Sequence, residues 1–377
     1  MSFQPPGGPP PPPPPGGPPP PGNPYPPQGY PGQWPQQQPW AAGPPPKKRG
    51  NGWKWGLGAL AVLVVIGVTA AVTISVTKDG AGGADGGPSP TGETFGLASA
   101  DDKGPANIIT EDPSCAAWGP IIKTLGEKQR NGWGDRDRSV PATQWTPEQR
   151  RQYEEVADAM RRAADQTAQV ARVTPHRVMR ELYEQFIAYA RAYADAVPNY
   201  TKPDNLLVGV AGGTSNAVTR ICATITYKAA PARAPLVASA PNPTVIAPLT
   251  DPNHPQMFLA DSDGICADFI RVLEKFDTDT SAWQALDPAI SASEWNPEQR
   301  RVIDDVIPLM DSLANDIQEL GLQSSNPTLQ DFAVVAAQYR RAYASALPSY
   351  STADSYFGAA SAGITSAVAD ACRASEQ

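Results

Sequence analysis

The heptapeptide WTPEQRR at residues 145–151 returns at residues 295–301 as WNPEQRR, a shift of 150 positions. The tyrosine-rich segment of residues 189–200 recurs at the same shift, and a cysteine follows each copy of it. Self-similarity at a fixed spacing is the sequence signature of a duplicated structural unit. Residues 115–222 and 266–377 are therefore predicted to be two copies of one domain.

Each copy contains the signals of four helices. At Thr146-Pro147 a hydroxyl N-cap precedes a proline at the first helical position, and the following Glu-Gln pair completes a capping box. The third helix is expected to begin with the same signal at Thr174-Pro175 and Asn326-Pro327. The fourth is expected to open with the capping boxes 201–204 and 351–354. No strand pattern competes, so the predicted fold class is all-α, with two tandem four-helix bundles.

The second helix of each copy has a single apolar face, because apolar residues recur at i, i+3, i+4 and i+7. In the first copy the face contains Tyr153, Val156, Ala157, Met160, Ala163, Ala164, Thr167 and Val170. In the second copy it contains Ile303, Val306, Ile307, Met310, Leu313, Ala314, Ile317 and Leu320. The first copy is richer in alanine, so any cavity is expected there. Pro308 is expected to kink the helix of the second copy.

The four cysteines fit the duplication. Four cysteines allow three pairings, and the pairs Cys115–Cys222 and Cys266–Cys372 give each copy its own bond between its first and last helix. Disulfide bonds persist in oxidising compartments, so this pairing favours a location outside the cytoplasm. If the two copies fold independently, Cys222→Ser will destabilise only the first and produce two separate melting transitions.

The first 46 residues do not have the composition of a packed core. They hold 22 of the 44 prolines and no Asp, Glu, Lys or Arg, which is typical of a disordered chain rich in polyproline II structure. Residues 1–54 are therefore predicted to be a disordered cytoplasmic tail that ends in a basic flank. Residues 1–46 are either a docking segment for a cytoplasmic protein or a spacer without a specific ligand.

A membrane anchor is predicted directly after this tail. Residues 55–76 are uncharged and mostly apolar, which is long enough to cross a hydrocarbon core of about 30 Å, and residues 55–77 are assigned to a transmembrane helix. Residues 1–54 carry +4 and the rest of the chain carries −12, so the N-terminus is predicted to lie in the cytoplasm and the C-terminal domains outside. A cleaved signal peptide is the alternative, but the proline-rich tail is unlike an n-region and the span is longer than an h-region.

Two linkers complete the predicted organisation. Residues 78–114 begin with a glycine-rich stretch and are predicted to be flexible. Residues 223–265 contain seven prolines and show no helical periodicity, so they are expected to form a semi-stiff spacer between the two bundles.

One duplicated set of side chains is the main candidate for a binding site. Its members are Tyr189, Arg191, Tyr193, Tyr200, Tyr339, Arg341, Tyr343 and Tyr350. They would either line a pocket in each bundle for an apolar molecule, with a tyrosine hydroxyl as a ligand to haem, or fill the core of the bundle. In the second interpretation, which we favour, Arg191 pairs with an acid such as Glu155, and Asp305 is the equivalent acid in the second copy.

Composition argues against several classes of function. The chain has two histidines, His176 and His254, and neither has a counterpart in the other copy, which disfavours general-base catalysis and metal binding. The exported part is acidic, which argues against nucleic-acid binding. We therefore predict no enzymatic activity, no catalytic residues, no metal site and no cofactor. Gly213 and Gly363 recur in mid-helix, which indicates close helix packing rather than a phosphate loop.

A wider resemblance follows from this layout. The chain has a proline-rich tail, a basic flank, one predicted span and an alanine-rich helical domain with the segment QYRRAYASALPSY at residues 338–350. It resembles actinobacterial, especially mycobacterial, envelope proteins of uncharacterised function. The resemblance implies an envelope location and brings no catalytic residues.

The function predicted from these features is that of a scaffold or adaptor. A single-pass envelope protein would bind protein partners through residues 1–46 and through its exported bundles. The alternative is a membrane-tethered carrier that holds a lipid or haem inside the bundles.

Overall fold

A computed structural model describes residues 94–377, and these residues contain helices and no strands. The predicted tail, the transmembrane helix at 55–77 and the glycine-rich start of the first linker lie outside the described residues. Within residues 94–377, none of the helices combines the length and apolar character needed to cross a membrane.

Each copy of the repeat forms four long helices, and we call residues 114–226 the first repeat and residues 266–375 the second. The first repeat contains α2 (Ser114–Gln129), α3 (Pro147–Val173), α4 (Arg177–Ala196) and α5 (Asn205–Thr226). The second contains α7 (Cys266–Asp279), the short α8 (Ser281–Gln284), α9 (Pro297–Gln323), α10 (Pro327–Ala346) and α11 (Ser355–Ser375). In both repeats the four long helices contact one another in a closed ring, so the all-helical prediction is confirmed.

The predicted capping boxes set the starts of the long second helices. The Thr146 hydroxyl accepts a hydrogen bond from the Gln149 backbone N–H at 3.2 Å, and the Gln149 side chain accepts one from the Thr146 N–H at 2.9 Å. Asn296 and Gln299 repeat the arrangement at 2.9 and 3.0 Å. These reciprocal bonds satisfy amide groups that have no partner inside a helix. From its cap, α9 runs to Gln323 and includes Pro308.

One predicted cap differs from the structure. Asn326 caps α10 by accepting from the Leu329 N–H at 3.1 Å, whereas Thr174 does not cap α4, which begins at Arg177 after His176. The Thr174 hydroxyl instead donates to the Asp112 carboxylate at 2.5 Å. Thr174 lies two residues before His176, the N-cap residue of α4, and its hydroxyl also accepts from the His176 N–H at 3.2 Å.

Both disulfide bonds join the first and last helix of a repeat. Cys115 pairs with Cys222 and Cys266 with Cys372, and the Cα atoms are 5.4 Å apart in each pair. The four cysteines of the chain are therefore all engaged, in the pairing that the duplication predicts.

The segments expected to be linkers pack against the helices. In residues 94–113, which we call the first strap, Leu97, Ile108 and Ile109 are buried, so the described part of the predicted flexible linker 78–114 is not free chain. The second strap is residues 227–265, and it contains α6 (Ala229–Arg233). Residues 223–265 were expected to form a spacer. Instead, α5 continues to Thr226, and the second strap then contacts both repeats through ion pairs and backbone bonds.

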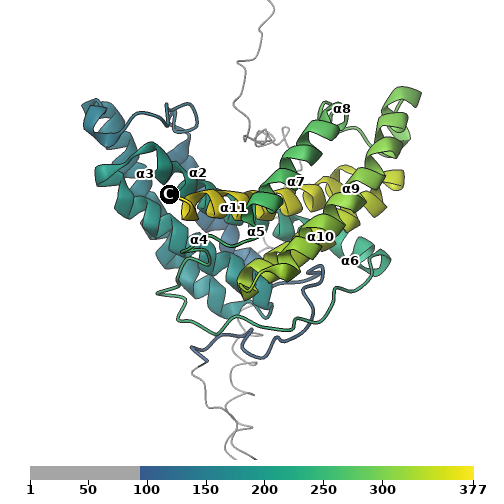
Figure 1. The fold of residues 1–377 in the computed structure, drawn as a ribbon, viewed down its shortest axis with the longest axis horizontal. Helices are drawn as coiled ribbons and strands as arrows, with labels where there is room; N and C mark the ends of the chain where they lie inside the picture. The colour runs from purple at the N-terminus through teal and green to yellow at the C-terminus, as the bar shows by residue number, and fades with distance from the viewer. Residues whose placement is uncertain (1–93) are drawn as a thin grey trace, which may run out of the picture. The chain divides into compact units, whose positions relative to one another are not determined.

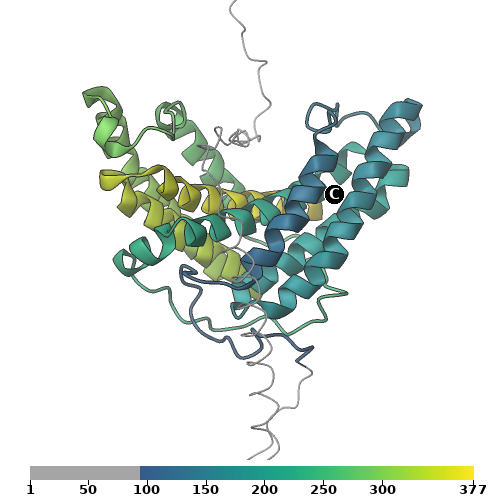
Figure 2. The same ribbon diagram turned by 180° about the vertical axis from the view of Figure 1, so that it is seen from behind.

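The two repeats pack against each other through their last helices. α5 and α11 lie side by side across the middle of the folded unit, with α3 and α4 on one side and α9 and α10 on the other (Figures 1 and 2). This helix pair is the most extensive in the described part of the chain. The expectation that the repeats fold independently is therefore not supported by their packing.

Candidate functional site at the junction of the two repeats

The α5–α11 contact depends on two glycines at equivalent positions. A methyl group at Gly213 would lie 2.8 Å from the Gly363 carbonyl oxygen and 2.9 Å from the Ala367 methyl group. A methyl group at Gly363 would lie 2.9 Å from the Ala217 backbone nitrogen. Since real Cβ atoms do not approach other atoms this closely, only glycine allows the two backbones to meet here. The predicted close packing is present, and it joins one repeat to the other.

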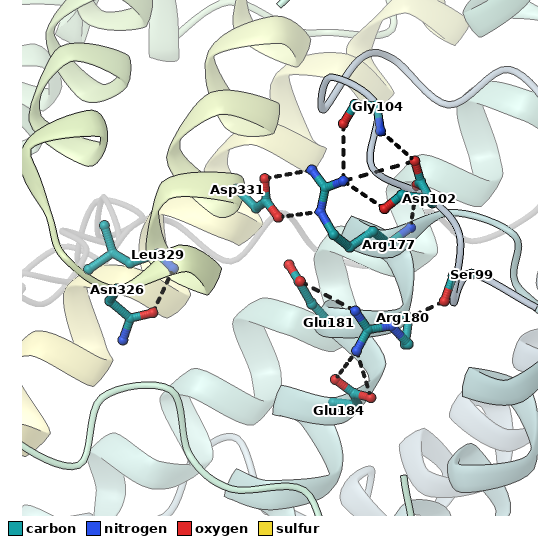
Figure 3. A network of polar contacts seen from close by, with 10 residues as sticks. All are labelled: Ser99, Asp102, Gly104, Arg177, Arg180, Glu181, Glu184, Asn326, Leu329 and Asp331. Carbon is teal, nitrogen blue, oxygen red and sulfur yellow. Dashed lines mark hydrogen bonds and ion pairs between the residues drawn. The ribbon is translucent and has the colours of Figure 1, made fainter. Parts of the chain in front are cut away.

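A buried ion pair joins the repeats at a second place, where α4 meets α10. The Arg177 guanidinium donates to both carboxylate oxygens of Asp331, at 2.6 and 2.9 Å (Figure 3). Its remaining nitrogen donates to the carbonyl oxygens of Asp102 and Gly104, at 3.0 Å each, so the first strap covers the pair. The two side chains are 1% and 5% exposed. A bidentate ion pair of this kind fixes the orientation of both side chains.

Arg180 organises the acids beside this pair. It donates to both carboxylate oxygens of Glu184, at 3.0 and 2.9 Å, and to the Ser99 hydroxyl of the first strap, at 3.1 Å. Its third nitrogen lies 3.5 Å from Glu181. The guanidinium groups of Arg177 and Arg180 are therefore both held by carboxylates and by the first strap.

Glu181 is the unusual member of this cluster. It is 1% exposed, and neither of its carboxylate oxygens has a hydrogen-bond partner among the described residues. Burial, together with the negative charge of Asp331, holds its pKa well above the ordinary value. Glu181 and Asp331 occupy equivalent positions of the two repeats. The duplication thus brings two equivalent acids together, and Arg177 bonds Asp331, while burial favours the protonated form of Glu181.

This cluster was not predicted, although the sequence contains a signal for it. Arg177, Arg180, Glu181 and Glu184 are spaced i, i+3, i+4 and i+7, which places four charged residues on one face of α4. Such a charged face is ordinarily solvated, because charged residues are almost never fully buried unless they are paired. The partner in the second repeat, Asp331, could not be identified without knowing that the repeats pack together.

Two of the predicted tyrosines hold the straps across the junction. Tyr189 of the first repeat donates to the Leu259 carbonyl oxygen at 3.4 Å, and Tyr339 of the second accepts from the Ile109 N–H at 3.2 Å. Ile109 precedes the first repeat and Leu259 precedes the second. Each repeat therefore also binds the segment that leads into the other, so each strap is bonded to both repeats.

The other four tyrosines pack at the outer end of each repeat. Tyr200 donates to the Arg138 carbonyl oxygen at 2.8 Å, and Tyr350 donates to the equivalent Pro288 carbonyl oxygen at 2.6 Å. The Tyr193 and Tyr343 rings lie against them, with centroids 6.3 and 6.2 Å away. Burial raises the pKa of Tyr343 to about 12 and keeps its hydroxyl protonated.

Arg191 pairs with an acid as predicted, but the partners of the two arginines are not the acids named as examples. Arg191 binds Asp165 at 2.6 Å, whereas Glu155 lies nearly three turns earlier on α3 and interacts with Arg151. Arg341 donates to the Asn315 and Gln318 side chains, at 2.8 Å each, rather than to Asp305. The tyrosines and arginines of the set are thus engaged in contacts within the protein. A role in ligand binding stays a prediction that these contacts do not favour.

One histidine, His176, directly precedes Arg177 of the junction, and the other, His254, lies in the second strap. His176 bonds the Glu111 carbonyl oxygen at 2.9 Å, and the largely exposed His254 lies 3.3 Å from Asp251. Across residues 94–377, no three His, Cys, Asp or Glu side chains are grouped as metal ligands.

Two hollows lie on the surfaces of the bundles. One of about 80 Å³ lies between α2 and α3 of the first repeat, and one of about 310 Å³ lies between the second strap, α9 and α10 of the second repeat. Both hollows lie at the surface, so the cavity expected inside the first bundle stays a prediction. None of the predicted tyrosines lines either hollow, whereas Arg341 of the predicted set lines the larger one.

Comparison with known proteins identifies a family to which the chain is similar. Residues 97–376 match the family described as "Mycobacterial ESX-1 associated protein". An uncharacterised protein of Mycolicibacterium smegmatis (strain MKD8) is 49% identical over 341 residues, which cover 90% of each chain. No solved structure is significantly similar.

Proposed function

The chain belongs to the family of mycobacterial ESX-1 associated proteins, and we propose that it serves the ESX-1 secretion system as a non-catalytic component that binds other proteins. The family match carries this proposal. It covers residues 97–376 and so coincides with the folded unit that begins at residue 94. The family model therefore spans both joined repeats, and it bears out the mycobacterial type of the chain, while the envelope location stays a prediction.

The arrangement of charged groups supports a binding role over a catalytic one. Arg177 bonds Asp331 of the second repeat and the first strap, and Arg180 bonds Glu184 and the first strap. Groups used in this way fix the two repeats in one orientation. A rigid platform is suited to protein binding, because little conformational entropy is lost when a partner docks.

The topology is proposed from the sequence. Residues 55–77 would anchor the chain, residues 1–54 would lie in the cytoplasm and the disulfide-bonded repeats would lie outside. The charge difference between the two parts and the presence of two disulfide bonds favour this orientation. The protein would then connect a cytoplasmic partner with one in the envelope.

The test uses the relative in Mycolicibacterium smegmatis. Its gene is deleted, and the proteins exported through ESX-1 are quantified in the culture filtrate by mass spectrometry. Export should fall in the deletion strain and recover when this chain is expressed. A version that lacks residues 1–46 should restore export only in part if the tail binds a partner. Unchanged export after deletion would refute the proposed role.

A further inference from the structure

The outer end of the first repeat contains a cluster of aromatic rings around Trp133. The centroid of the Trp133 ring lies 4.9 Å from that of Tyr153 on α3 and 6.1 Å from that of Tyr193 on α4. Arg136, in the loop between α2 and α3, places the central carbon of its guanidinium 3.6 Å from the Trp133 centroid. Arg136 is half-buried, whereas Tyr153 and Tyr193 are 1% and 0% exposed. A guanidinium that solvent can reach therefore lies beside two buried phenol groups.

Three polar atoms of this cluster are buried and have no hydrogen-bond partner among the described residues: the Arg136 Nε and the hydroxyls of Tyr153 and Tyr193. Each of the three carries a hydrogen that it can donate. Burial raises the pKa of Tyr193, and the charge of Arg136 and the Tyr153 hydroxyl act on the same group, so the three atoms are close enough to influence one another. Buried polar groups are nearly always paired, because leaving them unpaired is costly. Three such groups in one place therefore indicate a binding site.

The charge of Arg136 selects an anion as the ligand. Two of its nitrogens donate to uncharged groups, the Trp133 carbonyl oxygen at 2.7 Å and the Asn205 side-chain oxygen at 2.9 Å. It forms no ion pair with any residue in the range 94–377, and its sequence neighbours Asp135 and Asp137 are exposed. Burial lowers the pKa of Arg136, but an arginine remains protonated at neutral pH. The cluster therefore offers one positive charge and three free donors.

The second repeat shows that the fold does not require these polar groups. Leu286 stands at the position of Arg136 and Ile303 at the position of Tyr153, although the tryptophan recurs as Trp283. None of these three residues leaves a buried polar atom without a partner. The duplication thus supplies a natural comparison, in which the same bundle end is built with apolar side chains.

A different arginine approaches this end of the second repeat. Arg340 of α10 lies 5.2 Å from the centroid of the Phe276 ring, and its counterpart in the first repeat is Ala190. Its Nε also lacks a partner, but no tyrosine hydroxyl of the second repeat is buried without one. Within the described part of the chain, only the first repeat combines an unpaired guanidinium nitrogen with two unpaired phenols.

We propose that Arg136, Tyr153 and Tyr193 bind the carboxylate group of a small organic acid. The Arg136 Nε–H and the two hydroxyls donate to the carboxylate oxygens, and one positive charge balances one negative charge. A phosphate group is a poorer match, because it brings nearly two negative charges and more acceptors than three donors can satisfy. Since both tyrosines are almost fully buried, only a small acid reaches their hydroxyls. This site lies apart from the junction and goes beyond the proposed function.

The test is fluorine NMR of the full chain labelled with 5-fluorotryptophan. The signals of Trp133 and Trp283 are identified by their loss in Trp133→Phe and Trp283→Phe. The protein is titrated with sodium acetate, with sodium chloride as the ionic control and with acetamide as an uncharged molecule of similar shape. Acetate should shift the Trp133 signal in a saturable way, because Arg136 stacks on this ring. Chloride and acetamide should not produce this shift, and the Trp283 signal should stay in place.

Two variants then test the chemistry of the site. Arg136→Leu copies the second repeat and should weaken acetate binding about ten-fold or more, since a charged hydrogen bond is lost. Its control, Arg151→Leu, removes an exposed arginine of the same repeat and should leave acetate binding unchanged. Tyr153→Phe with Tyr193→Phe removes only the two hydroxyls, so the rings still pack and acetate binding should again weaken. Tyr343→Phe, at the position of Tyr193 in the second repeat, should have no effect on it.

Several results would overturn the proposal. If acetate gives no saturable shift at Trp133, the three donors hold only water, which can pair with groups of this kind. If chloride or acetamide shifts the signal as acetate does, the site does not recognise a carboxylate. Equal shifts at Trp283, or acetate binding that survives both the Arg136 and the double tyrosine variant, would show that acetate binds elsewhere.

Discussion

The contact between Gly213 and Gly363 predicts that two neighbouring glycines of α5 respond in opposite ways to the same substitution. Gly213 faces α11 and has no room for a methyl group, whereas a methyl group at Gly212 meets no atom within 4 Å. Both residues lie inside α5, so alanine improves helix propensity by roughly 0.5–1 kcal/mol at either position. The difference between the two variants therefore isolates the contact between the repeats.

The magnitude follows from what the new methyl group would displace. At Gly213 it would lie 2.8 Å from a backbone oxygen and 2.9 Å from a backbone nitrogen, neither of which can rotate away. The two helices must separate, and overpacking of this kind costs about 1–3 kcal/mol. Gly212→Ala should therefore raise the free energy of unfolding by about 0.5–1 kcal/mol. Gly213→Ala should lie about 1–3 kcal/mol below Gly212→Ala.

The assay is urea unfolding of the full chain, followed by far-ultraviolet circular dichroism, for the wild type and both variants. Gly363→Ala should behave like Gly213→Ala, because its methyl group would lie 2.9 Å from the Ala217 nitrogen. If Gly213→Ala stabilises the protein as much as Gly212→Ala, the two helices are not in contact and the junction described above does not exist.

Three further predictions concern the ion pair, the buried acids and a disulfide bond. Asp331→Asn removes the bidentate partner of the buried Arg177 and should lower the free energy of unfolding by about 3 kcal/mol or more in urea denaturation. The control, Asp268→Asn, removes an exposed pair with Arg271 and should change the free energy of unfolding by less than about 1 kcal/mol. Burial raises the pKa values of Glu181 and Glu184, and it raises the pKa of Asp370 to about 6. The folded state therefore binds more protons than the unfolded state, and the free energy of unfolding should rise as the pH falls from 7 through about 6. Asp370→Asn should flatten this rise in thermal melts recorded between pH 7 and 5, and a stability that falls over that range would contradict the assignment. Cys222→Ser should lower the free energy of unfolding by about 2–5 kcal/mol. A single melting transition should remain in calorimetry, because α5 carries Cys222 and also packs on α11. Two transitions would show that the repeats unfold independently.

Local signals in the sequence were sufficient for the helices and the disulfide bonds. The capping boxes at Thr146 and Asn296 and the spacing of the four cysteines depend on nearby residues or on the duplication, so they could be recognised without a structure. The same approach placed the cap of α4 wrongly at Thr174. That hydroxyl bonds Asp112, and such a contact depends on how the first strap folds back.

The junction could not be predicted because its partners are far apart in the chain. Arg177 and Asp331 are separated by 154 residues, and the duplication alone does not show which faces of the repeats meet. The duplicated glycines indicated close packing, but not that Gly213 would pack against its own counterpart. The bonds from Tyr189 to the second strap and from the first strap to Tyr339 could not be predicted either, since both tyrosines were interpreted as part of the core of a single bundle.

The central claim is that the two repeats act as one unit, and hydrogen exchange of the full chain tests it most directly. Exchange is followed by mass spectrometry at increasing urea, with peptides from α3 reporting on the first repeat and peptides from α9 on the second. If the repeats are joined as described, the two helices will lose protection together, with the same free energy of opening and the same dependence on urea. If α3 and α9 open with clearly different free energies, the repeats are independent and the rigid platform does not exist.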